Sequence, residues 1–191
     1  METKNTKKNS LKMLIADLCI CIVAILFDQL TKVHIRATLP VSSSYDVIPG
    51  VLEILHHENP GASWGMMKGQ TTLFLIIAVI VVIGLTFFAT RIPQEKKYRP
   101  LNIAASLILA GALGNTIDRV AKKTVTDFIY VSLINFPIFN VADIYIVVAT
   151  IGLAILILFV YKDEDLRFME FRKKTEKSEK TVDAEEKSEE D

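Results

Sequence analysis

Residues 141–161 read VADIYIVVATIGLAILILFVY, and Asp143 is the one charged residue in this stretch. A helix needs about 20 mostly apolar residues to cross a ~30 Å hydrocarbon core, and this stretch has that length and composition. An aspartate near the mouth of such a span is expensive to bury, so it is a functional-site hypothesis by default. The run Phe139-Asn140-Val141-Ala142-Asp143 also places Asn140 three residues before Asp143, on the same helix face.

Three further apolar blocks, at residues 13–30, 73–90 and 101–117, approach the same length. The chain is 51% hydrophobic with a mean hydropathy of +0.36, which is too apolar for an ordinary soluble domain. Only helices and closed barrels satisfy the backbone inside a bilayer, and these blocks lack the alternating pattern of barrel strands. The sequence therefore predicts an all-α membrane protein with four transmembrane helices.

Lys and Arg residues are distributed unevenly around the four blocks. Thirteen lie before the first block, between the second and third, or shortly after the fourth, whereas six lie in the other two loops. By the positive-inside rule, both termini and the loop 91–99 are predicted to be cytoplasmic. The loops 31–72 and 118–140 are then predicted to face outward.

The chain divides into a cytoplasmic lead at 1–10, a membrane domain at 11–161 and a charged tail at 162–191. From residue 163 onward the tail holds 12 acidic and seven basic residues and almost no apolar ones after Phe171. Such a segment has too little apolar surface to bury a core, so a disordered cytoplasmic tail is predicted, with a helix at its start as an alternative.

The larger outer loop contains turn signals at Pro49-Gly50 and at Asn59-Pro60-Gly61. The residues between them, 51–56, are compatible with a short strand. We therefore expect a small β-rich cradle on the outer membrane surface.

Three aspartates are candidates for acid–base chemistry at this surface: Asp118, Asp127 and Asp143. Asp118 is followed by Arg119 and two lysines, which favours a salt-bridged carboxylate that anchors a helix end. Asp127 has apolar neighbours, which raise the pKa of a carboxyl by desolvation, but a strand-edge or turn aspartate is an equally good interpretation. Asp143 could be a helix cap alone, although its place in a span favours function.

Small residues precede the first of these aspartates. The segment Gly111-Ala112-Leu113-Gly114-Asn115 would allow another helix or a peptide to approach closely. It leads into an Asn-x-x-Asp pattern at Asn115 and Asp118, which repeats at Asn140 and Asp143. Together the two helix ends predict a polar pocket at the outer rim of the membrane.

Other patterns carry less information. His56-His57-Glu58 lacks the spacing and third ligand of a metal site, and Cys19 and Cys21 lie on different sides of a helix, which makes them packing residues. The chain has no phosphate-binding glycine loop, no Ser-His-Asp pattern and no nucleic-acid footprint. A proton-coupled transporter and a membrane scaffold are the alternatives from other classes. The absence of mid-span charges argues against the transporter.

Five motifs in order resemble the lipoprotein signal peptidase, or signal peptidase II, family. They are Asp28-Gln29-x-Thr31-Lys32, Asn59-x-Gly61-Ala62-x-Trp64, Gly111-Ala112-Leu113-Gly114-Asn115-x-x-Asp118-Arg119, Val125-x-Asp127-Phe128 and Phe139-Asn140-x-Ala142-Asp143. Each motif alone is weak, but five in register with four spans are specific. The resemblance covers about residues 11–160. Ala110 and Trp64 stand where glycine and phenylalanine are common in the family.

The resemblance implies an aspartyl protease of the bacterial cytoplasmic membrane that removes the signal peptide of a prolipoprotein before a diacylglyceryl-modified cysteine. It implies Asp127 and Asp143 as the catalytic pair, no cofactor, contact with membrane lipids, and inhibition by globomycin. It also assigns Asp118 a supporting rather than a catalytic role. The positions that match supporting or substrate-binding residues of the family are Asp28, Lys32, Asn59, Gly61, Asn115, Asp118, Arg119, Asn140 and Ala142.

Two carboxylates without another nucleophile suggest attack by water. One ionised aspartate takes a proton from water while the other, protonated aspartate donates a hydrogen bond to the scissile carbonyl. Asp143 is expected in the first turn of a helix, where backbone N–H groups favour an anion. Asp127 is therefore the expected protonated partner.

Overall fold

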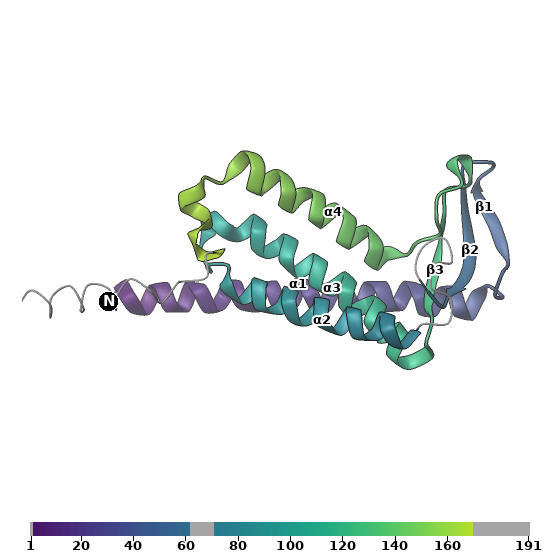
Figure 1. Cartoon of the computed structure of the whole chain (residues 1–191), viewed down its shortest axis with the longest axis horizontal. Coiled ribbons are helices and arrows are strands. Elements are labelled where there is room, and N and C mark those ends of the chain that lie inside the picture. The colour runs from purple at the N-terminus through teal and green to yellow at the C-terminus, as the bar shows by residue number, and fades with distance from the viewer. Residues whose placement is uncertain (1, 62–70, 170–191) are drawn as a thin grey trace, which may run out of the picture.

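The computed structural model describes residues 2–61 and 71–169, and four long helices and a small sheet make up most of it (Figure 1). The helices are α1 (Glu2–Thr38), α2 (Thr71–Arg91), α3 (Arg99–Lys122) and α4 (Val141–Ile155), with α4 continued by a π-helical turn at Leu156–Val160. The strands are β1 (Ser44–Ile48), β2 (Leu52–Asn59) and β3 (Val125–Tyr130). Short 3₁₀ helices lie at Lys96–Tyr98, Ser132–Ile134 and Asp163–Met169.

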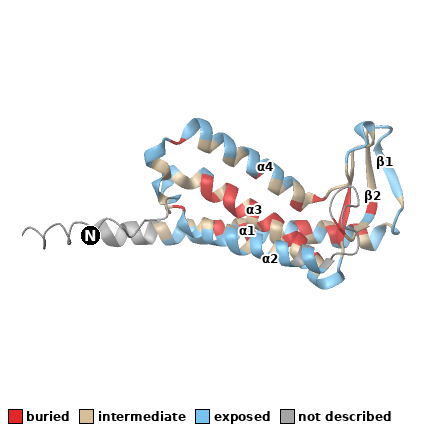
Figure 2. Ribbon diagram, viewed as in Figure 1, coloured by how far each residue is buried: buried red, intermediate tan, exposed pale blue. Residues whose placement is uncertain are grey.

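Three helical segments of the described chain are long and apolar enough to cross a membrane: Ser10–Thr38, Lys96–Lys122 and Val141–Val160. Ile76–Arg91 within α2 is a shorter apolar helix. Many residues on the outside of the helices are exposed (Figure 2). Many of these exposed residues have large apolar side chains, as expected for helices that face lipid rather than water. The predicted mostly helical fold with a small sheet is therefore confirmed, and three helices of the described chain meet both criteria for a span, whereas the fourth predicted span, α2, stays a prediction.

The sheet lies beyond one end of the helix bundle, next to the end of α1 and the start of α4 (Figure 1). Its three strands are antiparallel in the order β1-β2-β3. β2 covers most of the predicted strand at 51–56 and extends to Asn59. The turn before it contains Gly50 with φ of +71°, a conformation that favours glycine. Ala62 and Trp64 of the second motif lie outside the described residues.

α1 and α3 continue beyond the apolar blocks that predicted them, which end at residues 30 and 117. The polar ends of the two helices pair with each other, since Lys32 of α1 lies 3.0 Å from Asp118 of α3. Opposite charges therefore pair where the two helices leave their apolar blocks. β3 of the sheet contacts both α1 and α3, so the sheet is joined to these two helices.

Glycines allow α3 to approach its neighbours at this end of the bundle. A Cβ atom on Gly111 would lie 2.5 Å from the backbone oxygen of Ala142, and one on Gly114 would lie 2.5 Å from Oδ2 of Asp28. Both distances are shorter than real Cβ contacts, so a side chain at Gly111 would clash with the backbone of α4 and one at Gly114 would displace the Asp28 carboxylate. The predicted close approach at the small-residue segment is thus confirmed.

The opposite end of the bundle is closed by the segment after α4. Asp163–Met169 forms a 3₁₀ helix. The Tyr98 ring stacks on Tyr161 and meets Phe168 edge-on, while Lys97 pairs with Asp165. The beginning of the predicted tail therefore packs on the loop between α2 and α3, and residues 170–191 lie outside the described chain.

Candidate active site

The start of α4 is a capping box built from the Asn-x-x-Asp pattern. Asn140 is the N-cap residue, and its side-chain oxygen accepts a hydrogen bond from the backbone N–H of Asp143 at 3.2 Å. The Asp143 carboxylate in turn accepts from the backbone N–H of Asn140 at 3.0 Å. Asp143 therefore lies in the first turn of a helix, as predicted, where the helix dipole and free N–H groups favour a carboxylate.

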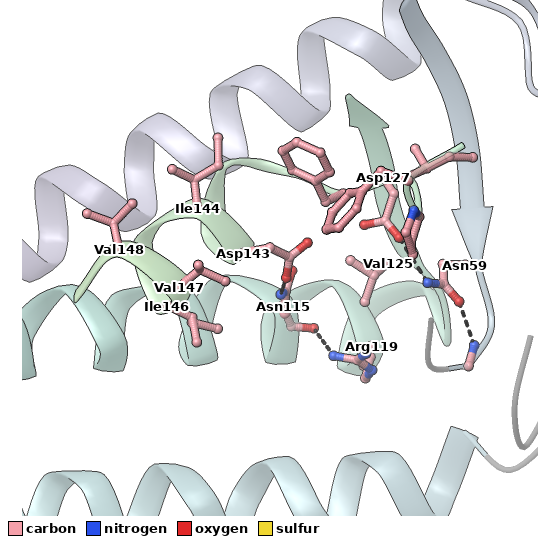
Figure 3. Close-up of a pocket in the computed structure, with 15 residues that line it drawn as sticks. Asn59, Asn115, Arg119, Val125, Asp127, Asp143, Ile144, Ile146, Val147 and Val148 are labelled. Carbon is pink, nitrogen blue, oxygen red and sulfur yellow. Dashed lines mark hydrogen bonds between the residues drawn. The ribbon is translucent and has the colours of Figure 1, made fainter. Parts of the chain in front are cut away.

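Side-chain amides connect Asp143 to Asp127 of β3. Asn140 Nδ2 donates to Oδ1 of Asp127 at 2.7 Å and to Oδ1 of Asn115 at 3.1 Å. Asn115 Nδ2 donates to Oδ1 of Asp143 at 2.8 Å (Figure 3). The two carboxylates thus share one hydrogen-bonded frame, although they come from a strand and a helix.

Asp127 is almost fully buried, with 4% of its surface exposed. Burial raises the pKa of its carboxyl to about 7, and the charge of Asp143 acts in the same direction, while hydrogen bonds from Asn59 and Asn140 oppose the rise. Asn59 Nδ2 donates to Oδ2 of Asp127 at 2.9 Å, and Asn59 Oδ1 accepts from the backbone N–H of Gly61 at 2.9 Å. The predicted effect of desolvation on Asp127 is confirmed.

A buried lysine supports this frame from α1. The Lys32 side chain is fully buried. Its Nζ lies 2.9 Å from Asp28, 3.0 Å from Asp118 and 2.9 Å from Oδ1 of Asn115. Asp28 also accepts a hydrogen bond from the backbone N–H of Ala142 at 3.0 Å, which ties α1 to the first turn of α4. A buried charge is tolerated when it is paired in this way.

Asp118 is salt-bridged, as predicted, but its main partner is on another helix. Lys32 lies 3.0 Å away, whereas Arg36 lies at 3.6 Å and Lys122 at 4.0 Å. Asp118 is not among the residues that line the pocket described next. Its place in a buried ion cluster agrees with a supporting role.

A pocket of about 580 Å³ opens beside the two aspartates. Figure 3 shows the carboxyl groups of Asp127 and Asp143 at this pocket with Asn59, Asn115 and Arg119 near them. Most of the remaining wall is apolar. Val125 and Phe139 of this wall belong to the sequence motifs. The lining residues that the motifs did not single out are Phe136, Pro137, Ile138, Ile144, Ile146, Val147 and Val148.

The structure gathers the residues predicted for the site around one pocket. Asn59, Gly61, Asn115, Arg119, Asp127 and Asp143 line it directly. Asn140, Ala142, Asp28 and Lys32 are buried behind it. The apolar lining was not predicted for two reasons. Its α4 residues belong to an apolar span, which indicates contact with lipid, and the segment 136–139 has no helical or strand periodicity.

The chemistry available at the pocket is that of two linked carboxyl groups. One is buried with its pKa near neutrality, and the other caps a helix N-terminus. Such a pair can hold one proton between two sites and exchange it with a substrate or water. Within the described residues, no group of three or more His, Cys, Asp or Glu side chains could hold a metal ion.

The chain is similar to known enzymes over most of its length. The family model described as "Signal peptidase (SPase) II" matches residues 20–159. The "Lipoprotein signal peptidase" of Staphylococcus aureus (strain MRSA252) is 41% identical over 146 residues, which are 75% of this chain and 86% of the relative. The protein of the same name from strain JH9 is 40% identical over the same shares.

Two solved structures have the same fold. One is described as "Bacterial membrane enzyme structure by the in meso method at 1.9 A resolution", with a TM-score of 0.65 and 38% identity over 76% of this chain and 94% of that chain. A second, at 2.3 Å, has a TM-score of 0.65 and 37% identity over 84% of this chain and 93% of the other. The chain belongs to the signal peptidase II family and is an aspartic endopeptidase of that family.

Proposed function

We propose that this enzyme removes the signal peptide from diacylglyceryl-modified prolipoproteins, cleaving just before the lipidated cysteine with Asp127 and Asp143 as a catalytic dyad. Membership of the family supports signal-peptide removal from prolipoproteins. The observation that carries the dyad is the shared amide frame, in which Asn140 contacts Asp127 directly and Asp143 through its cap.

The proposed mechanism follows from the different surroundings of the two carboxyl groups. Asp143, held at a helix N-terminus, is the ionised base that takes a proton from water. Asp127, with its pKa raised to about 7 by burial, is protonated and donates a hydrogen bond to the scissile carbonyl oxygen. The water oxygen then bonds to the carbonyl carbon, and the proton held by Asp143 passes to the leaving amine as the C–N bond breaks.

The supporting residues have roles that their contacts suggest. Asn115 and Asn140 orient the two carboxylates, and Asn59 holds Asp127 from β2. Asp28 and Lys32 fix the start of α4 against α1. Arg119 and Gly61 line the pocket and are placed to meet the substrate backbone or lipid head group.

The shape of the pocket suits a substrate that lies in the bilayer. Its polar groups gather beside the sheet, and its apolar wall continues along α4 through Ile144, Val147 and Val148. We therefore assign the apolar wall to the signal helix or acyl chains of the substrate. Globomycin is expected to inhibit by occupying the same pocket.

The membrane arrangement is part of the proposal. α2 has 21 residues, close to the ~20 needed for a span, and its only charged residue is Arg91 at its end. With α2 as a fourth span, both termini are cytoplasmic and the sheet and pocket lie at the outer face of the bacterial cytoplasmic membrane. The distribution of Lys and Arg supports this orientation.

The test is cleavage by the purified protein in detergent. A prolipoprotein carrying the diacylglyceryl group should yield a product that begins at the lipidated cysteine, as identified by mass spectrometry. The same precursor without the lipid should be cleaved much more slowly. Absence of cleavage, or cleavage at another bond, would contradict the proposal, and proton-coupled transport by the protein in vesicles would support the transporter alternative.

A further inference from the structure

The reverse face of the β2–β3 pair carries a chain of polar contacts that the proposed mechanism does not use. Asp127 and Asn59 point from these strands toward the pocket (Figure 3). Residues of opposite parity, Glu58 and Thr126, face each other on the other side, where the backbone register pairs them directly. Thr126 is fully buried and immediately precedes Asp127.

Three side chains contact the Glu58 carboxylate on this face. The hydroxyl groups of Thr124 and Thr126 donate to its two carboxylate oxygens at 2.5 and 2.8 Å, and Nε2 of His56 lies 3.1 Å from Oε1. Burial acts to raise the pKa of Glu58, but these hydrogen bonds hold it below its ordinary value. Glu58 is therefore an ionised acceptor that holds the beginning of β3 against β2.

Both ends of this chain of contacts are attached to α1 and the residue just after it. Nδ1 of the buried His56 ring lies 2.7 Å from the backbone oxygen of Leu39. Arg36 donates to the hydroxyl oxygen of Thr126 at 2.9 Å, which leaves the hydroxyl proton for Glu58. The series Leu39–His56–Glu58–Thr126–Arg36, here called the reverse-face chain, thus binds both strands to one rigid helix end.

A β-bulge makes this attachment matter for the active site. Ile54 pairs with Ile129 and His57 pairs with Asp127. Between these two pairs β2 advances by three residues while β3 advances by two. A one-residue slip exchanges the faces of a strand, and bulges re-aim side chains beside active sites. The bulge lies at residues 55–56, and the His56 ring at this bulge is buried. Beyond the bulge, Asn59 is aligned to reach Asp127.

We infer that the reverse-face chain is a positioning device for Asp127, with His56, Glu58 and Thr126 as positioning residues that hold the register in which Asn59 reaches its carboxylate. The inference rests on the proposed peptidase function. When the chain is broken, Asn59 no longer holds Asp127 at 2.9 Å, and the carboxyl group moves relative to Asp143.

The test compares Thr126→Val, which keeps the shape but removes the hydroxyl, with Thr126→Ser, which restores it. Glu58→Gln is a second isosteric variant, and Glu53→Gln, on the same strand before the bulge, is the control. We expect Thr126→Val and Glu58→Gln to lower kcat on the lipidated precursor by about fivefold to tenfold, with KM within about twofold, since small misplacements of catalytic groups reduce turnover. Thr126→Ser and Glu53→Gln should match the unmodified enzyme.

A second readout separates positioning from simple destabilisation. The hydrogen bond from Asn59 lowers the pKa of Asp127, so its loss should move the basic limb of the pH–rate profile up by about half a pH unit. The infrared carboxyl band of isotope-labelled Asp127 should titrate with the same shift, and this measurement needs no turnover. Unchanged titration in both Thr126→Val and Glu58→Gln would overturn the inference, as would equal loss in Thr126→Ser. Absence of cleavage by the unmodified enzyme would contradict the proposed function instead.

Discussion

Asp127 owes its properties to the folded surroundings rather than to its own segment. Its pKa is raised to about 7 because burial disfavours the charge, even though two amide groups donate to it. A carboxyl group in this state is a hydrogen-bond donor near neutral pH, which is what a scissile carbonyl needs. The amide hydrogen bonds hold the Asp127 carboxyl group in the frame that it shares with Asp143, while its pKa stays near neutrality.

The raised pKa of Asp127 predicts how stability depends on pH. The folded protein binds this proton more tightly than the unfolded chain, so the contribution to stability is present below pH 3.8 and is lost as pH rises to about 7. Asp127→Asn has no such loss. Its thermal midpoint in detergent, relative to the unmodified protein, should therefore increase between pH 4 and about pH 7, by the equivalent of roughly 1.4 kcal/mol per pH unit, and level off above pH 7. Asp46→Asn, at an exposed position of β1, is the control, and a flat difference for Asp127→Asn would contradict the raised pKa.

Asp118 should behave as a structural residue. Asp118→Asn removes one of the two carboxylates that pair with buried Lys32, while Asp28 remains at 2.9 Å. We expect a loss of about 1–3 kcal/mol in the free energy of unfolding, below the 3–5 typical when a buried charge loses its only partner. Turnover per folded molecule should stay within about tenfold. Complete loss of turnover with an unchanged thermal midpoint would show that Asp118 acts in the chemistry.

At the scale of elements, the site depends on how closely α3 packs against α1 and the first turn of α4. Gly111 and Gly114 make this approach possible. The same first turn supplies the cap of Asp143 and the Ala142 N–H that binds Asp28. The packing of α3 and α1 against the first turn of α4 therefore also sets the position of the Asp143 carboxylate.

Adding a methyl group at this contact should disturb both stability and activity. Gly111→Ala puts Cβ 2.5 Å from the Ala142 oxygen and 2.7 Å from Ile146 Cγ1, so we expect overpacking of about 1–3 kcal/mol and reduced turnover as α4 shifts. Gly152→Ala on α4 is the matched control, because no atom lies within 4 Å of its added Cβ. It should be neutral or stabilising by up to about 1 kcal/mol. Thermal midpoints and initial rates of the two variants decide the matter, and equal behaviour would contradict the packing account.

Local patterns predicted the elements better than the contacts between them. The place of Asp143 in the first turn of α4 was predicted from the start of the apolar span, and the strand near 51–56 was predicted from its turn signals. The pairing of Asp118 with Lys32 did not, because the nearest cations in the sequence are Arg119 and the lysines after it, while the observed partner is on another helix. The β2 bulge was also missed, since register is a property of two strands and the residues of one strand do not specify it.

At the scale of the whole molecule, the two ends of the bundle differ in character. The sheet and the pocket lie at one end, while the loop between α2 and α3 and the segment Asp163–Met169 close the other (Figure 1). The ion pair of Arg99 with Asp17 joins α3 to α1 near the second end. The distribution of Lys and Arg predicts that this end is cytoplasmic.

Reporter fusions test this orientation and the number of spans. A reporter after Tyr161 and another within 91–99 should both be cytoplasmic, and one at Ser43, in the turn before β1, should be external. The expected pattern requires α2 to span the membrane, because an odd number of spans would place the two ends of the chain on opposite sides. An external reporter after Tyr161 would show that one helix does not cross.

The central claim is that Asp127 and Asp143 together perform the hydrolysis, and single isosteric variants test it most directly. Initial rates on a diacylglyceryl-modified prolipoprotein should be measured for purified Asp127→Asn and Asp143→Asn, with correct folding shown by their thermal midpoints. Each variant should lose turnover by at least about 10³-fold, because one carboxyl group cannot act both as base and as donor to the carbonyl. Turnover near that of the unmodified enzyme in either folded variant would contradict the dyad.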